Sequence, residues 1–194
     1  MSDAKHKLLS LRFVTVVTCG TFYFIALAML TPVIPHYVKD DLGQGDFAVG
    51  IATGVFAVGA ILLRLYFGRL GDRLGRRVLI IFGASVVAVT TLMYGAVDSL
   101  AWLIVWRFAT GFGEAAFFVG AATMVTDLAP VERRGEAISY WSIAVYSGLA
   151  FGPALGELLR GTDRYVLTFT VSAALAGVAA LLGLFTRDVP REPS

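Results

Sequence analysis

Charged residues are scarce in this chain. Asp, Glu, Lys and Arg together make up 15% of its 194 residues, whereas soluble domains carry about 25%. Hydrophobic residues make up 57%, and the mean hydropathy is +0.76. One soluble core of this size cannot bury that many apolar side chains, so we expect most of them to face lipid.

Several kinds of chemical machinery are also missing. The chain has one cysteine, Cys19, which excludes an intrachain disulfide. It has no cluster of metal ligands, no nucleophile beside a base and no Walker sequence for binding phosphate. These absences argue against an enzyme, a nucleic-acid-binding protein and an ATP-driven pump. We therefore expect no cofactor, no metal and no nucleic-acid partner, and we expect an ion or substrate gradient as the energy source of any transport.

Long apolar segments fill most of the sequence. A helix needs about 20 apolar residues to cross a hydrocarbon core about 30 Å thick. The sequence therefore predicts an all-α, polytopic membrane protein in which residues 1–186 form one six-helix bundle, followed by the start of a cytoplasmic linker or tail at 187–194. The six predicted spans are approximately 12–38, 47–69, 78–97, 100–126, 136–159 and 165–186.

Lys and Arg are distributed unevenly among the connections. If the N-terminus is cytoplasmic, eleven of these residues lie in inside segments, and three (Lys39, Arg160 and Arg164) lie in outside segments. Cytoplasmic loops of membrane proteins carry an excess of positive charge. We therefore expect both termini in the cytoplasm and the protein in a bacterial inner membrane.

Glycines recur every four residues in the fifth predicted span, at Gly148, Gly152 and Gly156, with Pro153 among them. Small residues at this spacing let membrane helices approach closely, and a proline inside a helix removes a backbone hydrogen bond and bends the helix. The pattern favours a closely packed bundle that changes shape, although static packing explains it equally well.

A ten-residue motif, Gly68-Arg69-Leu70-Gly71-Asp72-Arg73-Leu74-Gly75-Arg76-Arg77, connects the second and third predicted spans. Its glycines permit a tight turn, and Arg73, Arg76 and Arg77 are expected at the lipid headgroups. Asp72 is expected at the membrane boundary, where it needs an Arg or a helix N-terminus as a partner. A simple positive-inside turn is the alternative, but such a turn requires neither Asp72 nor this glycine spacing.

The motif resembles the loop signature of the major facilitator superfamily, G-x-L-a-D-R-x-G-R-R/K, with Gly71 as the departure. Three other segments resemble family patterns in the same order: Pro32 to Pro35, Arg107 to Gly113 with Thr110 in place of Gln, and Gly148 to Gly156. The last pattern is associated with drug and metabolite antiporters. The resemblance implies the N-terminal six-helix half of such a transporter, built from two inverted three-helix repeats.

The resemblance also implies a gate. In this family, residues matching Asp72, Arg76 and Asp127 form a charge cluster that closes the cytoplasmic side by docking on the other half. Arg73 and Arg77 flank this cluster. We expect the other half to be the C-terminal part of a longer chain, a separate chain or a second copy.

Two charged residues lie deep in the fourth predicted span. Arg107 and Glu114 are seven residues apart, so they share one helix face, with Thr110 between them. A charge at this depth normally faces a wet cavity or the bundle interior, and burial favours the protonated form of a carboxyl group. Glu114 is therefore a candidate proton carrier, and Arg107 and Thr110 are candidates for tuning it or binding substrate. A structural Arg–Glu pair is the alternative.

Other side chains in the spans give less specific predictions. Arg64 is about two turns from the inner end of the second span, and we expect its long side chain to reach the membrane interface. Four aromatic residues are candidates for lining a cavity, although they are equally suited to face lipid or neighbouring helices. They are Tyr23, Phe117, Tyr140 and Tyr146.

The predicted partners are the lipid bilayer, a small-molecule substrate, protons and a second six-helix half. The first functional hypothesis is proton-coupled efflux by alternating access. The second is a facilitator or symporter of the same fold, and the third is a half-size membrane protein with no transport of its own.

Overall fold

The structure, a computed structural model, describes residues 8–161 and 164–188. Within these ranges the chain forms helices and no strands. The α-helices are α1 (Leu11–His36), α2 (Asp46–Leu62), α3 (Arg64–Leu74), α4 (Arg76–Met93), α5 (Leu100–Leu128), α6 (Arg134–Arg160) and α7 (Tyr165–Leu184). Short helical segments are the π-helix η1 (Tyr37–Asp41) and the 3-10 helices η2 (Tyr94–Ala96) and η3 (Val131–Arg133).

Five segments are long and apolar enough to cross a membrane on their own: Leu11–Asp41, Arg76–Ala96, Leu100–Leu128, Val131–Arg160 and Tyr165–Leu184. α2 and α3 together meet the same criterion as a sixth, broken span. The prediction of an all-α, polytopic membrane protein with six spans is therefore confirmed.

The second span differs from the prediction of one continuous helix over 47–69. α2 ends at Leu62, α3 begins at Arg64, and the two helices are bent by 44° relative to each other. α3 continues to Leu74, so motif residues 70–74, which were predicted to follow the second span as a loop, are helical. A single residue, Gly75, separates α3 from α4; its φ of 95° is a value that favours glycine.

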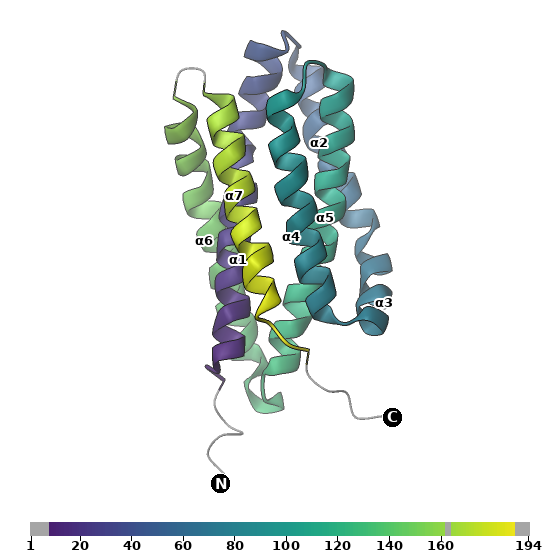
Figure 1. Cartoon of the computed structure of the whole chain (residues 1–194), viewed down its shortest axis with the longest axis vertical. Helices are drawn as coiled ribbons and strands as arrows, with labels where there is room; N and C mark the ends of the chain where they lie inside the picture. The colour runs from purple at the N-terminus through teal and green to yellow at the C-terminus, as the bar shows by residue number, and fades with distance from the viewer. Residues whose placement is uncertain (1–7, 162–163, 189–194) are drawn as a thin grey trace.

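The helices pack side by side in one bundle (Figure 1). α1 packs along α6 and α7, α4 packs along α5 and α7, and α2 packs along α5. The α3–α4 turn lies at the same end of the bundle as the start of α1 and the end of α7. We call this end the Gly75 end.

Glycines allow α6 to approach α1 closely. A Cβ atom added at any of three α6 glycines would overlap with atoms of α1, so larger residues there would push the helices apart. α6 remains one helix from Arg134 to Arg160 although Pro153 lies in the same stretch. The close pairs are Gly148 with Phe24, Gly152 with Ala28 and Gly156 with Met29.

Candidate functional site

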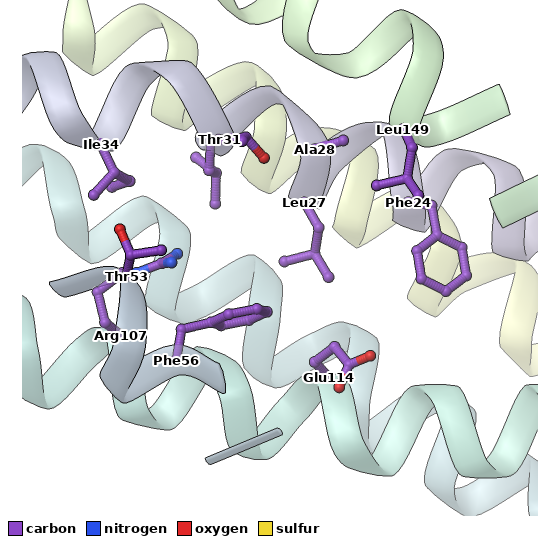
Figure 2. Close-up of a pocket in the computed structure, with 11 residues that line it drawn as sticks. Phe24, Leu27, Ala28, Thr31, Ile34, Thr53, Phe56, Arg107, Glu114 and Leu149 are labelled. Carbon is purple, nitrogen blue, oxygen red and sulfur yellow. The ribbon is translucent and has the colours of Figure 1, made fainter. Parts of the chain in front are cut away.

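An apolar cavity of about 260 Å³ lies between α1, α2, α5 and α6, near the lower end of the range for ligand pockets. Figure 2 shows Leu27 of α1 on one side of the cavity, with Phe56 of α2 and Glu114 of α5 across from it. Most of the wall is hydrophobic, and its charged residues are Arg107 and Glu114. The lining consists of Phe24, Leu27, Ala28, Leu30, Thr31, Ile34, Thr53, Phe56, Arg107, Glu114 and Leu149.

Arg107 is held against α2. Its Nε atom donates a hydrogen bond to the carbonyl oxygen of Ala52 at 3.0 Å, and its guanidinium group lies 4.6 Å from the centre of the Phe56 ring. Arg107 is 7% exposed. A backbone carbonyl and an aromatic face thus stabilise its charge, and the flat guanidinium suits both contacts.

Glu114 forms an ion pair with Arg64, the first residue of α3. The Arg64 Nη2 and Glu114 Oε1 atoms are 3.1 Å apart, and the guanidinium lies 4.3 Å from the centre of the Phe118 ring. The second carboxylate oxygen, Oε2, is buried without a hydrogen-bond partner among the described residues. The carboxylate therefore has one paired and one unpaired oxygen beside an apolar cavity.

One prediction is wrong. We expected the Arg64 side chain to extend to the membrane interface, and it pairs with Glu114 instead. The structural Arg–Glu pair that stood as the alternative for Glu114 forms with Arg64 and not with Arg107. The need of a buried carboxylate for a cation was the signal that pointed to some arginine, but the sequence did not indicate that Arg64 packs against this face of α5.

Thr110 does not line the cavity. It is fully buried, and its Oγ1 atom lies 2.8 Å from the carbonyl oxygen of Trp106 and 2.9 Å from Thr90 Oγ1, beside the Tyr94 hydroxyl. Three residues turn a helix by about 300°, so Thr110 lies about 60° around α5 from Arg107. That rotation brings Thr110 against α4, where it joins a cluster of hydroxyl groups.

The aromatic residues of the cavity wall are Phe24 and Phe56, and the four predicted aromatic residues lie elsewhere. Tyr23 and Phe117 are stacked in the core with ring centres 3.6 Å apart, and neither is exposed. Tyr140 packs edge-on against Phe13. Tyr146 is 68% exposed on α6. Hydropathy indicates how deep a ring lies in the membrane but not the direction in which it points.

A second group of charges lies at the Gly75 end. Arg76 Nη2 is 2.8 Å from Asp72 Oδ1, and Arg76 Nε is 3.4 Å from Asp127 Oδ2. The structure thus brings together, from α3, α4 and α5, the three residues that the resemblance grouped. Arg73 lines the same depression of about 330 Å³, and Arg77 Nη2 donates to the carbonyl oxygen of Leu184 at 2.7 Å.

Asp188 is a member of this group that the sequence did not indicate. Its Oδ1 atom accepts hydrogen bonds from the backbone N–H groups of Arg76 and Arg77, at 2.8 and 3.0 Å. These N–H groups open α4, and a carboxylate there satisfies them and interacts favourably with the helix dipole. Residues 187–194 were predicted only to begin a linker, so the sequence offered no spacing that places Asp188 on this turn.

The motif glycines differ in their surroundings. At Gly71 an added Cβ would press on the Arg76 and Leu79 side chains, and at Gly75 it would overlap with the Asp188 carboxylate. At Gly68 an added Cβ would meet open space within the part of the chain described. Gly68 was expected to permit the tight turn, but it lies inside α3, and no close approach of a described neighbour requires glycine there.

Known proteins resemble the chain in sequence. The family model described as Major Facilitator Superfamily matches residues 16–194. Multidrug resistance protein 1 of Bacillus subtilis (strain 168) is 28% identical over 171 residues, which cover 88% of this chain and 43% of that protein. Quinolone resistance protein NorA of Staphylococcus aureus is 23% identical over 169 residues, or 87% of this chain and 43% of that protein. The chain spans less than half the length of these relatives.

Solved structures share the fold. A bacterial homologue of the human lysosomal transporter Spinster, in an inward-facing and occupied conformation, has a TM-score of 0.83 and 24% identity over 92% of this chain and 44% of its own. A D-xylose-proton symporter has a TM-score of 0.78 and 13% identity over 92% of this chain and 48% of its own. At these identities the likeness establishes the architecture.

Proposed function

Because this chain belongs to the major facilitator superfamily, we propose that it forms part of a transporter that moves a small molecule across a bacterial inner membrane by alternating access. We further propose that the transport is efflux coupled to protons. The two relatives similar in sequence are named for resistance to drugs and to quinolones, which supports export over uptake.

The observation that carries this proposal is Glu114 at the wall of the apolar cavity. Its Oε2 atom is buried and has no hydrogen-bond partner within the described ranges. An ionised carboxylate at this depth is costly, and binding a proton removes the charge. Glu114 is therefore expected to bind and release a proton when the cavity opens to water on either side.

The Gly75 end is the proposed cytoplasmic end. Arg69, Arg73, Arg76 and Arg77 all lie at this end, in keeping with the excess of positive charge in cytoplasmic loops.

An impermeant maleimide tests this orientation on Arg73→Cys and Gln44→Cys variants that carry Cys19→Ala. In intact spheroplasts we expect the cysteine at position 44 to react and the cysteine at position 73 to react only after permeabilisation. The opposite pattern contradicts the orientation.

A second six-helix unit is the proposed partner. The relatives are more than twice as long as the matched segment, and the charged group of Asp72, Arg76 and Asp127 at the Gly75 end offers a polar surface for a facing helix. This unit is a C-terminal half, a separate chain or a second copy. The charged group then acts as a latch that closes the cytoplasmic side.

Transport of an amphiphilic fluorescent cation tests the function. Inside-out vesicles containing the chain are given an interior acidic pH gradient, and ethidium uptake is followed by fluorescence. We expect gradient-dependent uptake by the wild type, its loss in Glu114→Gln, and normal uptake in Glu132→Gln, which changes an exposed carboxylate of η3.

The remaining outcomes separate the alternatives. Uptake that does not depend on the gradient indicates a facilitator and contradicts proton coupling. Full coupling in Glu114→Gln contradicts the role of this carboxylate. Because these vesicles contain this chain alone, the second unit must be another copy, and no uptake by the wild type contradicts transport by a pair of copies.

A further inference from the structure

The break between α2 and α3 lacks a cause in its local sequence. Residues 60–66 read Ala-Ile-Leu-Leu-Arg-Leu-Tyr and include neither proline nor glycine, although sharp bends in helices nearly always occur at such residues or where a group intrudes into the backbone ladder. Leu63 at the break keeps a right-handed helical conformation, with φ of −92° and ψ of −6°. Leucine and arginine are good helix formers, so this segment favours a continuous helix.

Tertiary contacts with α5 are therefore the remaining cause of the bend. α2 crosses α5 closely at Gly59 and Gly111, where an added Cβ on either glycine would overlap with the backbone of the other helix. After the break, α3 keeps contact with α5 through the Arg64–Glu114 ion pair and through Phe67, whose ring centre is 4.9 Å from that of Phe112. One charged and one aromatic contact thus hold α3 in its bent position.

The charged contact depends on the protonation state of Glu114. The Glu114 side chain is 8% exposed, and that of Arg64 is 42% exposed. While Glu114 is ionised, separating the pair would leave a carboxylate unpaired in the bundle interior, which is unfavourable. When Glu114 is protonated, Arg64 loses its ionic partner, and its long side chain is free to move toward water or the headgroups.

We propose that Arg64 is a positioning residue that converts protonation of Glu114 into movement of α3. The ion pair holds α2 and α3 bent while Glu114 is ionised, and protonation releases α3 toward a straighter α2–α3 helix. This inference rests on the proposed role of Glu114 as a proton carrier.

The release has a direct route to the charged group at the Gly75 end. Asp72 lies on α3, eight residues after Arg64, or about 12 Å along the helix axis. Its ion pair with Arg76 joins α3 to α4, and Arg76 also contacts Asp127 of α5. A change in the direction of α3 therefore alters the geometry of the proposed latch without any contact between Glu114 and the latch itself.

Few other titratable groups face Glu114. Tyr23 of α1 lies close enough to interact with its charge, Arg64 approaches from α3, and Arg107 shares its cavity. The aromatic contact between Phe67 and Phe112 does not titrate. Other charged or basic residues on the helices around α5 lie toward the ends of the bundle: Arg12, His36, Asp46, Arg69, Asp72, Arg73, Arg76, Arg77, Arg134, Glu136, Glu157 and Arg160.

Distances between spin labels across the break test the inference. Labels are placed at Phe47 of α2 and Leu74 of α3, both exposed, in the full chain with Cys19→Ala in lipid nanodiscs. At a rise of 1.5 Å per residue, straightening a 44° bend lengthens this separation by about 3 Å. We expect the wild type to show the shorter distance at about pH 8 and the longer distance at about pH 4, on either side of the ordinary pKa of a glutamate side chain.

Variants identify the ion pair as the cause. Glu114→Gln and Arg64→Gln should show the longer distance at both pH values, and Arg64→Lys should restore the pH-dependent change. The double variant Arg64→Gln/Glu114→Gln leaves neither charge unpaired, so it guards against misfolding, and it should match the single variants. Arg69→Gln, which changes another α3 arginine, should behave as the wild type.

A short, pH-dependent distance in Arg64→Gln overturns the inference, as does a wild-type distance that is the same at both pH values. Gradient-driven ethidium uptake, measured on the same variants, separates this result from the proposed function. A pH-dependent bend without uptake contradicts the proposed function alone. Proton-coupled uptake with a bend that does not depend on pH contradicts this inference alone.

Discussion

Arg107 and Glu114 share one face of α5, yet each is held by a different element. Arg107 contacts the backbone and an aromatic ring of α2, and Glu114 pairs with Arg64 of α3. Their spacing in the sequence predicted that they share a face, because this follows from helical periodicity. Their partners were not predictable in this way, since these depend on how α2 and α3 cross α5.

The geometry of Arg107 leads to a prediction at the scale of one residue. Arg107→Lys keeps the positive charge but loses the planar group that lies over Phe56 and donates to Ala52. A buried cation–π contact and a hydrogen bond from a charged group each contribute about 2 kcal/mol, so we expect a loss of stability of about 2–3 kcal/mol. Thermal unfolding in detergent measures it. Arg69→Lys on α3 is the control, and equal melting temperatures for the two variants contradict the prediction.

Thr110 and Tyr23 show the limit of prediction from sequence for single side chains. Both lie within predicted spans; Thr110 was a candidate for tuning Glu114 or binding substrate, and Tyr23 was a candidate for lining a cavity. Their directions depend on which neighbour each helix face meets: Thr110 joins Thr90 and Tyr94, and Tyr23 stacks on Phe117. A hydrophobic segment that is buried on most sides has little amphipathic signal to orient it, so depth is predictable and direction is not.

At the scale of elements, the six spans followed from hydropathy because each must cover the thickness of the membrane. The bend at Leu63 and the helical character of residues 70–74 did not follow, because both depend on tertiary contacts. Gly75 is the exception: its place in the motif predicted a tight turn, and the structure has a one-residue turn with φ of 95° there.

The surroundings of Gly75 lead to a prediction about this turn. Gly75→Ala combines a strained backbone conformation with an overlap between the new Cβ and the Asp188 carboxylate, and we expect a loss of about 1–3 kcal/mol from the strain plus a weakened Asp188 contact. Hydrogen exchange at the backbone amides of Arg76 and Arg77, which donate to Asp188, should become faster.

Gly43→Ala is a matched control for this prediction. Gly43 also has a positive φ, of 63°, but an added Cβ would meet open space within the described part of the chain. We expect a smaller loss of stability and unchanged exchange at residues 76 and 77. Equal effects of the two substitutions on exchange at these amides contradict the role of the Asp188 contact.

At the scale of the whole molecule, the cavity has one sheltered and one open side. Phe24 of its wall is buried in the bundle, whereas Leu149 on α6 is 52% exposed. Tyr146 lies one turn earlier on α6 and is 68% exposed. Of the residues in an 18-residue apolar window of each span, 22% are buried in the span of α6 and 61% in the span of α5. From these exposures, together with relatives of more than twice the matched length, we expect the proposed second unit over the open side of the cavity.

Cross-linking tests this placement in a membrane that contains this chain and no C-terminal half, where the second unit must be another copy. Tyr146→Cys and Val178→Cys are each made with Cys19→Ala, and dimers are counted after oxidation. Val178 is 39% exposed on α7, a helix that contributes no residue to the cavity wall.

If copies face each other across the cavity, the cysteine at position 146 forms dimers several-fold more efficiently than the cysteine at position 178, because only the former lies in the contact. Random collisions would give similar yields at both positions, since both side chains are accessible from the membrane. Similar yields, or a higher yield at 178, therefore contradict pairing through the α6 face.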